Sequence, residues 1–302
     1  MADNPRSALP YLALVLNALV WGCSWWPLRT LQGLGLHALW ASAATYLLGT
    51  AAIAMFSPAA LKEYARNPAL WLLGLAAGTT MVGFNWGVTI ADVIRVVLLF
   101  YLMPVWAALL ARFVLHEPLT LRVALRIGMA LAGAALVLSP PGQIGFPWPS
   151  ALGEWLGLMG GAAFALNNTL LRHQKAASAQ ARLLGMFVGG VLVPAAVALG
   201  LGMLPSSSMA AIPLPAWPGV AGLWVLLGFA ASLLLANHGL QYGASRLPAN
   251  VSAVVMLSEV VFATASAIAF AGESLTLQVA AGGALILLAA GLSALENPAG
   301  HG

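Results

Sequence analysis

Charged residues are the scarcest class in this sequence: only 7% of its 302 residues are Asp, Glu, Lys or Arg. A soluble chain of this length usually carries about 25% charged residues, which keep its surface hydrated. With 61% hydrophobic residues and a mean hydropathy of +0.93, this chain cannot cover its surface with polar groups. The composition therefore excludes a soluble globular protein and indicates an integral membrane protein.

Cysteine is nearly absent as well, because Cys23 is the single one in the sequence. One cysteine excludes an internal disulfide framework and a CxxC redox pair. A net charge of +4, spread over loops, does not form the basic stripe that nucleic-acid binding needs. The five histidines show no metal-ligand spacing, and neither a P-loop nor a Gly-X-Ser-X-Gly motif is present. We therefore expect no metal, no cofactor, no nucleic-acid partner and no enzymatic activity.

Long apolar runs are abundant. A helix needs about 20 apolar residues to cross a hydrocarbon layer about 30 Å thick. The first such run resembles a signal peptide, but the bulky Trp21 before Gly22 does not suit a cleavage site, so we expect an uncleaved membrane helix. The sequence therefore predicts an all-α integral membrane protein with ten transmembrane helices, at residues 9–31, 36–56, 69–91, 93–115, 121–138, 151–172, 183–204, 217–241, 247–271 and 275–295.

The distribution of Lys and Arg predicts the orientation of these spans. Basic residues accumulate on the cytoplasmic side of membrane proteins. With a cytoplasmic N-terminus, ten of the twelve Lys and Arg residues fall on the inner side, and only Arg29 and Arg95 fall on the outer side. We therefore expect a multi-pass protein of the cell inner membrane with both termini in the cytoplasm.

The two halves of the sequence resemble each other. Residues 85–88 (Asn-Trp-Gly-Val) match residues 237–240 (Asn-His-Gly-Leu), and residues 116–120 (His-Glu-Pro-Leu-Thr) match residues 272–276 (Gly-Glu-Ser-Leu-Thr). These offsets predict two units of five helices each, residues 1–142 and 143–302. Because five is odd, the second unit must cross the membrane in the opposite sense, with Glu117 inside and Glu273 outside. Inverted repeats of this kind are frequent in secondary transporters.

Several sequence motifs resemble those of a known family. The five-plus-five plan, the run Tyr-Leu-Met-Pro-Val-Trp at 101–106 and the paired Glu-X-Leu-Thr motifs resemble the drug/metabolite transporter superfamily, EamA type, over nearly the whole chain. Residues 256–263 (Met-Leu-Ser-Glu-Val-Val-Phe-Ala) and the many tryptophans most resemble the bacterial aromatic amino acid exporters of the YddG kind. The resemblance implies a secondary transporter that exports aromatic and other apolar amino acids, or similar small amphipathic metabolites, by alternating access. The family commonly has Glu where this chain has Met103, so the role of that glutamate is not carried over.

Glu259 is the first candidate site residue and lies near the middle of the ninth apolar segment. An ionised carboxylate at the bilayer centre costs roughly 2.5 kcal/mol or more, so such residues face a bundle interior or a watery cavity. Glu259 could hold a substrate ammonium group, relay a proton, or pair with another polar group for packing alone. Ser258 beside it could address the charged ends of a substrate. Proton coupling stays open at this stage.

Aromatic residues form the second candidate set. Trp21, Tyr101 and Phe164 lie deep within their spans, where ring faces could receive aromatic or cationic substrates. Trp and Tyr also gather at membrane interfaces, which is the simpler explanation for the tryptophans near span ends. The depth of these three residues favours a place in the cavity wall.

Amide side chains and one proline complete the candidates. Asn85, Asn168 and Asn237 offer both a donor and an acceptor, as a zwitterionic substrate requires, although Asn also forms hydrogen bonds between neighbouring helices. Pro104 removes a backbone hydrogen bond inside the fourth helix and predicts a kink that could act as a hinge.

Several other functions compete with amino acid export. A nucleotide-sugar or sugar-phosphate carrier would need Lys or Arg at the midplane, but these residues lie at span ends. A drug-cation carrier of the same superfamily is a further alternative. A passive channel would conduct without saturation, and a membrane-embedded enzyme would need a catalytic cluster at one membrane face. We expect a carrier with a small-molecule substrate and the lipid bilayer as its surroundings, and its oligomeric state is open.

Overall fold

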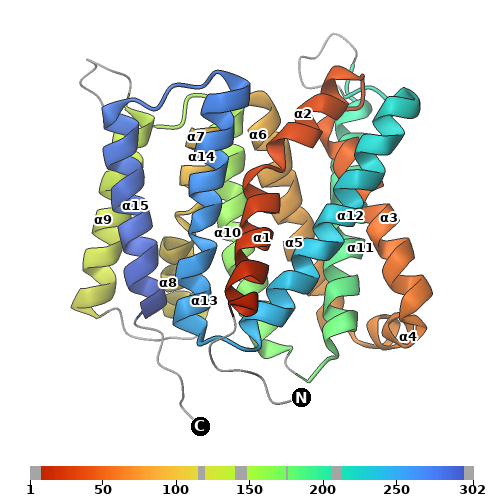
Figure 1. Ribbon diagram of the computed structural model, residues 1–302, viewed down its shortest axis with the longest axis horizontal. Helices are drawn as coiled ribbons and strands as arrows, with labels where there is room; N and C mark the ends of the chain where they lie inside the picture. The colour runs from red at the N-terminus through yellow and green to blue at the C-terminus, as the bar shows by residue number, and fades with distance from the viewer. Residues whose placement is uncertain (1–7, 115–119, 140–147, 175, 206–211, 296–302) are drawn as a thin grey trace.

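The computed structural model describes residues 8–114, 120–139, 148–174, 176–205 and 212–295, and all regular structure in these ranges is helical (Figure 1). Each of the ten expected spans is a single helix or a run of two or three successive helical elements. The first half contains α1 (Leu9–Gly22), α2 (Trp25–Gly33), α3 (Ala38–Phe56), α4 (Pro58–Arg66), α5 (Pro68–Met81), η1 (Val82–Trp86), α6 (Gly87–Ile90), α7 (Val93–Phe100), α8 (Met103–Val114) and α9 (Leu121–Leu138). The second half contains α10 (Leu152–His173), α11 (Ala179–Gly202), α12 (Gly219–Ala244), α13 (Ala249–Met256), α14 (Ser258–Ala271) and α15 (Leu277–Leu295).

The lengths and hydropathy of these helices confirm the all-α membrane fold. Eight helical segments in the described residues are long and apolar enough to cross a membrane, and residues Leu277–Ser293 form a shorter apolar helix. The remaining segment, α10, has 22 residues but carries Glu154 and the amides Asn167 and Asn168. The seventh span begins at Ala179, four residues earlier than expected, because Ser178 accepts a hydrogen bond from the Ala181 N–H and caps the helix.

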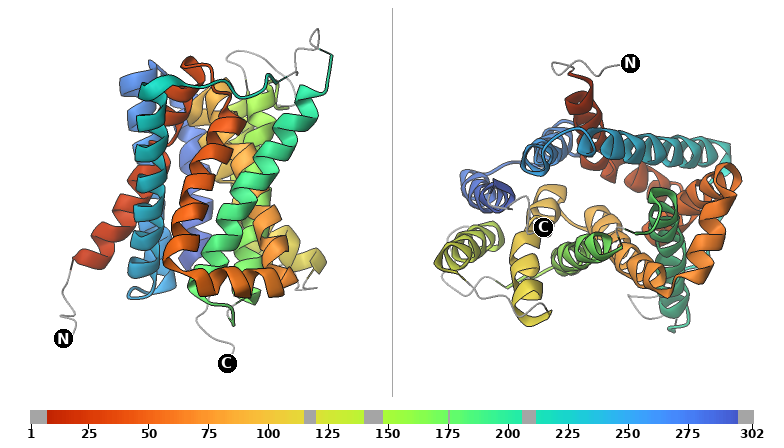
Figure 2. Two further views of the ribbon diagram at one scale, coloured as in Figure 1. Left: turned by 90° about the vertical axis from the view of Figure 1, so that its right-hand side faces the viewer. Right: turned by 90° about the horizontal axis from the view of Figure 1, so that it is seen from below.

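Two helix groups make up the centre of the molecule. α1 packs against α12, α13 and α14, and we call these four helices, with α2, the α1 group. α10 packs against α5, η1, α6, α7 and α8, and we call these six elements the α10 group. α9 and α15 pair at one edge of the bundle, and α3, α4 and α11 lie at the opposite edge (Figures 1 and 2).

Glycines allow the closest helix contacts. A Cβ at Gly74 of α5 would lie 2.7 Å from the Gly185 carbonyl of α11, and a Cβ at Gly282 of α15 would lie 2.6 Å from the Gly133 carbonyl of α9. Because these glycines have no side chain, the backbones pack closer than a Cβ would allow, as small residues permit in membrane helices.

The two ends of the bundle differ in charge, and we name them upper and lower as they appear in Figure 1. α1 begins and α15 ends at the lower end, whereas α2, the turn between α6 and α7, and the end of α14 lie at the upper end (Figure 1). Glu273 directly follows α14, and Arg29 in α2 and Arg95 in the first turn of α7 belong to elements of the upper end. The other described Lys and Arg residues belong to α4, to the starts of α9 and α11 and to the ends of α8 and α10, or follow the end of α12, at or near the lower end. Glu117, whose position relative to Glu273 the repeat predicts, lies outside the described residues.

Candidate functional site

The fourth and ninth spans are both interrupted, and they meet where they are interrupted. α7 ends at Phe100 and α8 begins at Met103, while α13 ends at Met256 and α14 begins at Ser258. Across this junction, the hydroxyl of Tyr101 donates a hydrogen bond to Glu259 Oε2 at 3.1 Å and lies 3.3 Å from the carbonyl of Met256. The structure therefore brings together two of the residues that the sequence analysis selected.

Pro104 explains the interruption of the fourth span. A proline ring clashes with the carbonyl four residues earlier and offers no N–H to it. That carbonyl belongs to Phe100, the last residue of α7. The chain then turns through Tyr101 and Leu102, and Pro104 becomes the second residue of α8, where the missing N–H needs no partner. The helix is thus interrupted for two residues just before the proline, at Tyr101 and Leu102.

Glu259 is held in a buried position at the start of α14. Its side chain belongs to the first turn of this helix, where the N-terminal end of the helix dipole favours a carboxylate. Glu259 is 9% exposed and Tyr101 is 3% exposed, so each has little contact with solvent. α1 approaches the same turn closely, because a Cβ at Gly22 would lie 2.6 Å from the Glu259 carbonyl.

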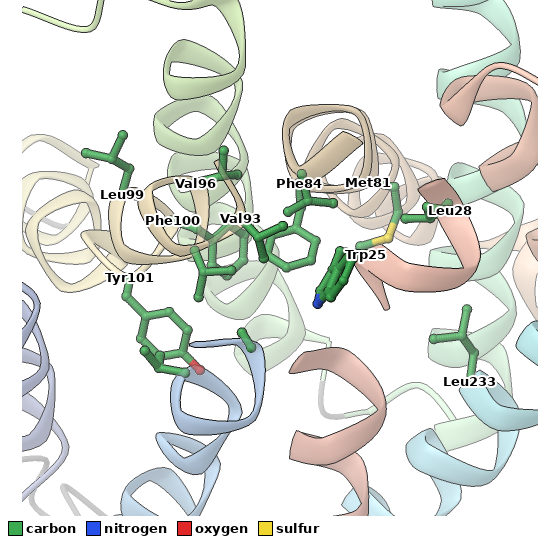
Figure 3. Close-up of a cluster of buried hydrophobic side chains, with 14 of the residues drawn as sticks. Trp25, Leu28, Met81, Phe84, Val93, Val96, Leu99, Phe100, Tyr101 and Leu233 are labelled. Carbon is green, nitrogen blue, oxygen red and sulfur yellow. The ribbon is translucent and has the colours of Figure 1, made fainter. Parts of the chain in front are cut away.

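An aromatic cluster adjoins the Tyr101–Glu259 pair, and it is built from four different spans. The ring of Phe100 lies 5.0 Å from Phe84, 5.3 Å from Phe164 and 6.1 Å from Tyr101, measured between centroids. Phe84 in turn contacts the edge of Trp21 at 6.5 Å. Figure 3 shows Phe84, Phe100 and Tyr101 side by side in the core. Trp21 and Phe164, although deep within their spans, are only half-buried.

The amide residues and Ser258 are not brought into this cluster by any hydrogen bond in the described structure. Asn85 is buried in η1 and donates to Ser42 Oγ of α3 at 2.9 Å. Asn237 donates to the Leu233 carbonyl of its own helix at 2.8 Å, and Ser258 donates to Val255 at 2.7 Å. Asn168 is half-buried on α10, one turn below Phe164.

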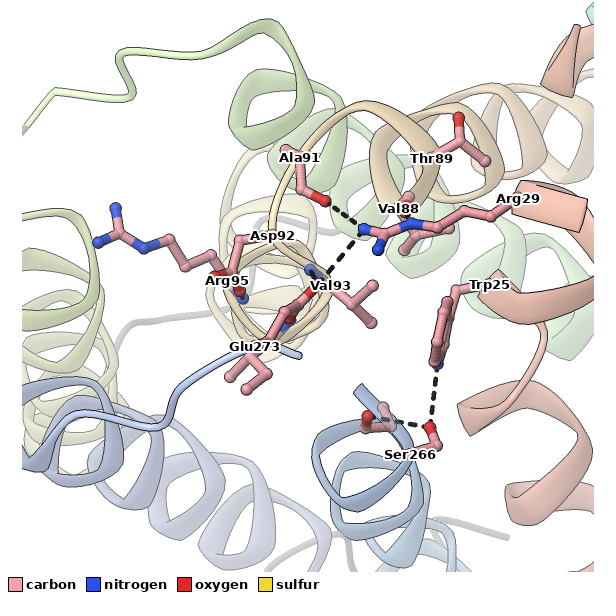
Figure 4. A network of polar contacts seen from close by, with 12 residues as sticks. Trp25, Arg29, Val88, Thr89, Ala91, Asp92, Val93, Arg95, Ser266 and Glu273 are labelled. Carbon is pink, nitrogen blue, oxygen red and sulfur yellow. Dashed lines mark hydrogen bonds and ion pairs between the residues drawn. The ribbon is translucent and has the colours of Figure 1, made fainter. Parts of the chain in front are cut away.

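A second polar centre lies at the upper end (Figure 4). The carboxylate of Glu273 accepts hydrogen bonds from the backbone N–H groups of Val93 at 2.9 Å and Ile94 at 3.1 Å. Arg29 reaches Glu273 at 3.4 Å and also donates to the carbonyls of Val88 at 2.9 Å and Ala91 at 2.8 Å. The sequence analysis did not connect these residues, because Arg29 and Glu273 are 244 positions apart.

Burial is the main influence on the titration of Glu273. It raises the pKa of this carboxyl above its ordinary value, and the hydrogen bonds from the Val93 and Ile94 N–H groups offset the effect only in part. The neighbouring carboxyl of Asp92 adds to the increase of the pKa, through its charge and a hydrogen bond. Nearby, Arg95 forms a separate ion pair with Glu154 at 3.3 Å.

An apolar groove of about 560 Å³ lies elsewhere, between α5, α8 and α10. Its walls include Leu75 and Phe113, which are 54% and 72% exposed. None of the predicted site residues lines it. Such an exposed apolar surface between membrane spans faces the acyl chains of lipid.

Comparison with known proteins finds a family match in the first half of the chain. The EamA-like transporter family matches residues 8–139. A search of curated proteins finds no match. One solved crystal structure superimposes with a TM-score of 0.60 at 16% sequence identity, covering 95% of this chain and 96% of that one, which shows a shared fold.

The match shows that residues 8–139 are similar to membrane transporters of the EamA-like family. For such a transporter, the geometry offers a ring-lined centre beside one buried carboxyl group. Within the described residues, no group of three or more His, Cys, Asp or Glu could hold a metal ion.

Sequence reasoning missed Phe84 and Phe100, which connect Trp21 to Phe164. Both are next to selected residues, Asn85 and Tyr101, in the sequence. Adjacent residues on a helix point about 100° apart, so two neighbouring side chains can both border one cluster. The signal that could have found them is the aromatic character of two positions beside selected ones, in spans expected to face each other.

Proposed function

We propose that this protein is a secondary transporter of the inner membrane that exports aromatic and other apolar amino acids, or similar small amphipathic metabolites, by alternating access. The observation that carries the proposal is the aromatic cluster around Phe100, directly beside the Tyr101–Glu259 pair. Ring faces would contact the apolar side chain of the substrate. Glu259 would receive its ammonium group, and the substrate would replace the hydroxyl of Tyr101 as the partner of this carboxylate.

The half-buried amides would serve the other end of the substrate. Asn168 and Asn237 retain exposed surface within their spans, and the amide of Asn237 bonds only within its own helix among the described contacts. An amide N–H can donate to the substrate carboxylate without a fixed charge. Amide side chains beside one carboxyl group suit a zwitterion better than a phosphorylated sugar, which would call for Arg or Lys at the same depth.

We further propose that residues 1–142 and 143–302 are inverted repeats. The packing of α1 against α12, α13 and α14 has a counterpart in the packing of α10 against α5, α7 and α8. In both units the fourth span is interrupted, at Tyr101–Leu102 and at Leu257. Two similar halves of this kind can exchange conformations and expose one central site to either side.

The orientation follows from charge. We propose that the lower end, with most of the described basic residues, faces the cytoplasm, as does each terminus. The pathway would then be loaded from below and discharged above.

The test is transport by the purified protein in proteoliposomes. Labelled aromatic amino acids, apolar amino acids, sugars and cationic drugs would be offered with and without a pH gradient. We expect saturable uptake and counterflow of aromatic amino acids. Transport of sugar phosphates or cations alone would overturn the substrate class, and flux without saturation or counterflow would indicate a channel.

A variant separates substrate binding from proton coupling. If Glu259 relays protons, Glu259→Gln abolishes uptake driven by a pH gradient and retains solute exchange. Glu63→Gln is the control: it makes the same change at a carboxyl on α4 that accepts hydrogen bonds from Ser178, and it should transport normally. Equal loss of both activities in Glu259→Gln, or loss of neither, would contradict the proton relay.

A further inference from the structure

We propose that Arg29 and Glu273 form the lock of an outer gate, which closes the upper end of the transport pathway and must release the turn between α6 and α7 whenever substrate leaves. This inference rests on the proposed function, because a gate presupposes alternating access. It assigns a role to two charged residues that are not members of the aromatic cluster.

The lock bridges the two central helix groups. Arg29 on α2 and Glu273, just after α14, both come from the α1 group, whereas all four of their backbone partners come from the α10 group. Arg29 bonds to the last carbonyls of α6 and Glu273 bonds to the first N–H groups of α7 (Figure 4). The lock therefore fastens a single turn from both sides.

A second contact lies directly below the lock. Trp25 Nε1 donates to Ser266 Oγ at 3.0 Å, which joins α2 to α14. The guanidinium group of Arg29 lies over the ring of Trp25, 5.2 Å from its centroid, as a cation–π contact. Figure 4 shows Trp25 between Arg29 and Ser266. The Arg29 side chain thus contacts both Glu273 and the ring of Trp25, which lies beneath it.

The two groups meet in the upper half of the molecule and separate in the lower half. α14 contacts α7 and α2 contacts α6, both above the helix interruptions. Their lower counterparts, α13 and α8, make no comparable contact with each other in the described residues. The structure thus has the arrangement expected of a carrier closed at the top, and the interruptions at Tyr101–Leu102 and Leu257 are where the helices can bend.

The chemistry of the lock makes it reversible. The partners on the turn are backbone groups at the end of one helix and the start of the next, which have no partner within their helices. Water at the upper surface can satisfy these groups when the lock opens, and Arg29 keeps 29% of its side-chain surface exposed even when closed. Opening exchanges one set of hydrogen bonds for another, so the gate can cycle.

The lock also responds to external pH. The groups around Glu273 are Arg29 on α2, Asp92 before α7 and, one turn further, Arg95, which is paired with Glu154 of α10. Because burial in the closed gate raises the pKa of Glu273, closure favours its protonated form, and opening returns the carboxyl to water. Closure is therefore favoured at acidic external pH and weakens as the pH rises through the raised pKa.

The experiment measures access through the upper end. In a Cys23→Ser background, Ser266→Cys places a thiol below the lock, and a membrane-impermeant thiol reagent is added to intact cells. Arg29→Ala and Glu273→Ala should each raise the labelling rate about tenfold, a typical size for a coupling between two states. Arg95→Ala is the matched control: its ion pair lies at the same end but joins α7 to α10 within one group.

The outcomes decide the proposal independently of the substrate. Equal labelling rates for Arg29→Ala, Arg95→Ala and the parent would overturn it. If a variant is not recovered as a monodisperse protein, the test uses Arg29→Lys, which keeps the charge but cannot reach carbonyls and carboxylate together, and which should label faster than the parent. Faster labelling in a protein that moves no amino acid would retain the gate and refute the proposed function.

A pH series completes the test. Glu273→Gln resembles the protonated carboxyl and can still accept hydrogen bonds from the α7 N–H groups, so it should stay closed at every pH. The labelling rate of the parent, divided by that of Glu273→Gln, should rise with external pH, and this ratio removes the reactivity of the thiol itself. A ratio that is constant or falls would contradict the pH response.

Discussion

At the residue scale, the burial of Glu259 depends on the hydroxyl of Tyr101. An acidic side chain inside a membrane span needs a polar partner or water to avoid a large desolvation cost. Tyr101 supplies that partner from a different span, at 3.1 Å. The pair is therefore both a structural link between two interrupted helices and the charged end of the proposed site.

The first prediction removes this hydroxyl. Tyr101→Phe should lower the melting temperature in detergent, because a buried carboxyl that loses its hydrogen bond destabilises a fold by about 1–3 kcal/mol. It should also change the apparent affinity for substrate. Tyr46→Phe is the control, since its hydroxyl bonds to the weakly accepting sulfur of Met81, and should have a smaller effect on stability and none on transport. Similar results for both variants would remove the special role of Tyr101.

The second prediction concerns the aromatic cluster. Phe100→Ala should reduce counterflow of aromatic amino acids more than counterflow of small apolar ones, because Phe100 is the ring that contacts Phe84, Tyr101 and Phe164. Phe187→Ala, which removes an equally buried ring packed on Tyr46 away from the cluster, controls for loss of packing. An equal loss for all substrates in Phe100→Ala would indicate a structural role only.

At the scale of helices, interrupted spans and glycine contacts have different roles: the first provide points of bending and the second hold helices together. The interruptions at Tyr101–Leu102 and Leu257 are the points where α7 and α14 would bend relative to α8 and α13 in the proposed alternating access. The glycine contacts between α5 and α11, and between α9 and α15, fix helices at the edges of the bundle. A carrier needs both, since movable elements must work against a rigid frame.

The third prediction tests the rigid part. Gly74→Ala should lower the melting temperature by an amount that reflects overpacking, about 1–3 kcal/mol, because its Cβ would lie 2.7 Å from the backbone of α11. Gly128→Ala, within α9, is the control: a Cβ there meets nothing within 4 Å, and alanine favours the helix. If Gly74→Ala is as stable as Gly128→Ala, the two helices are not held by close backbone contact.

At the scale of the whole molecule, the charge difference between the two ends determines how the bundle is expected to sit in the membrane. The upper end carries few basic residues, and Arg29 and Arg95 are both engaged in ion pairs there. The pairing reduces the net positive charge of this end. A low positive charge is typical of the side that is translocated across the membrane when the protein inserts.

The fourth prediction tests the orientation. In the Cys23→Ser background, Trp217→Cys at the upper end should react with an impermeant thiol reagent in intact cells. Lys62→Cys on α4, at the lower end, should react only after the membrane is permeabilised. Both positions lie outside the membrane spans, and Trp217 is 70% exposed. Labelling of Lys62→Cys alone in intact cells would reverse the proposed direction of export.

The sequence by itself determined the membrane class and the positions of the helices. These features depend on local composition, because a span needs only enough apolar residues in one run. The end of α7 near Pro104 could also be anticipated, because a proline disturbs the helix just before it. The selection of Glu259 as a candidate site residue also rested on its position in the sequence, near the middle of an apolar run.

Only the tertiary structure decided which side chains meet. The partner of Glu259, the role of Phe100 as the centre of the rings, and the contact of Arg29 with Glu273 all join residues from different spans. Almost every face of these helices is apolar, so the sequence carries no strong periodic signal to separate a face that packs inward from one that meets lipid. Packing between helices selects the inward face, and it does so through shape and a few polar contacts.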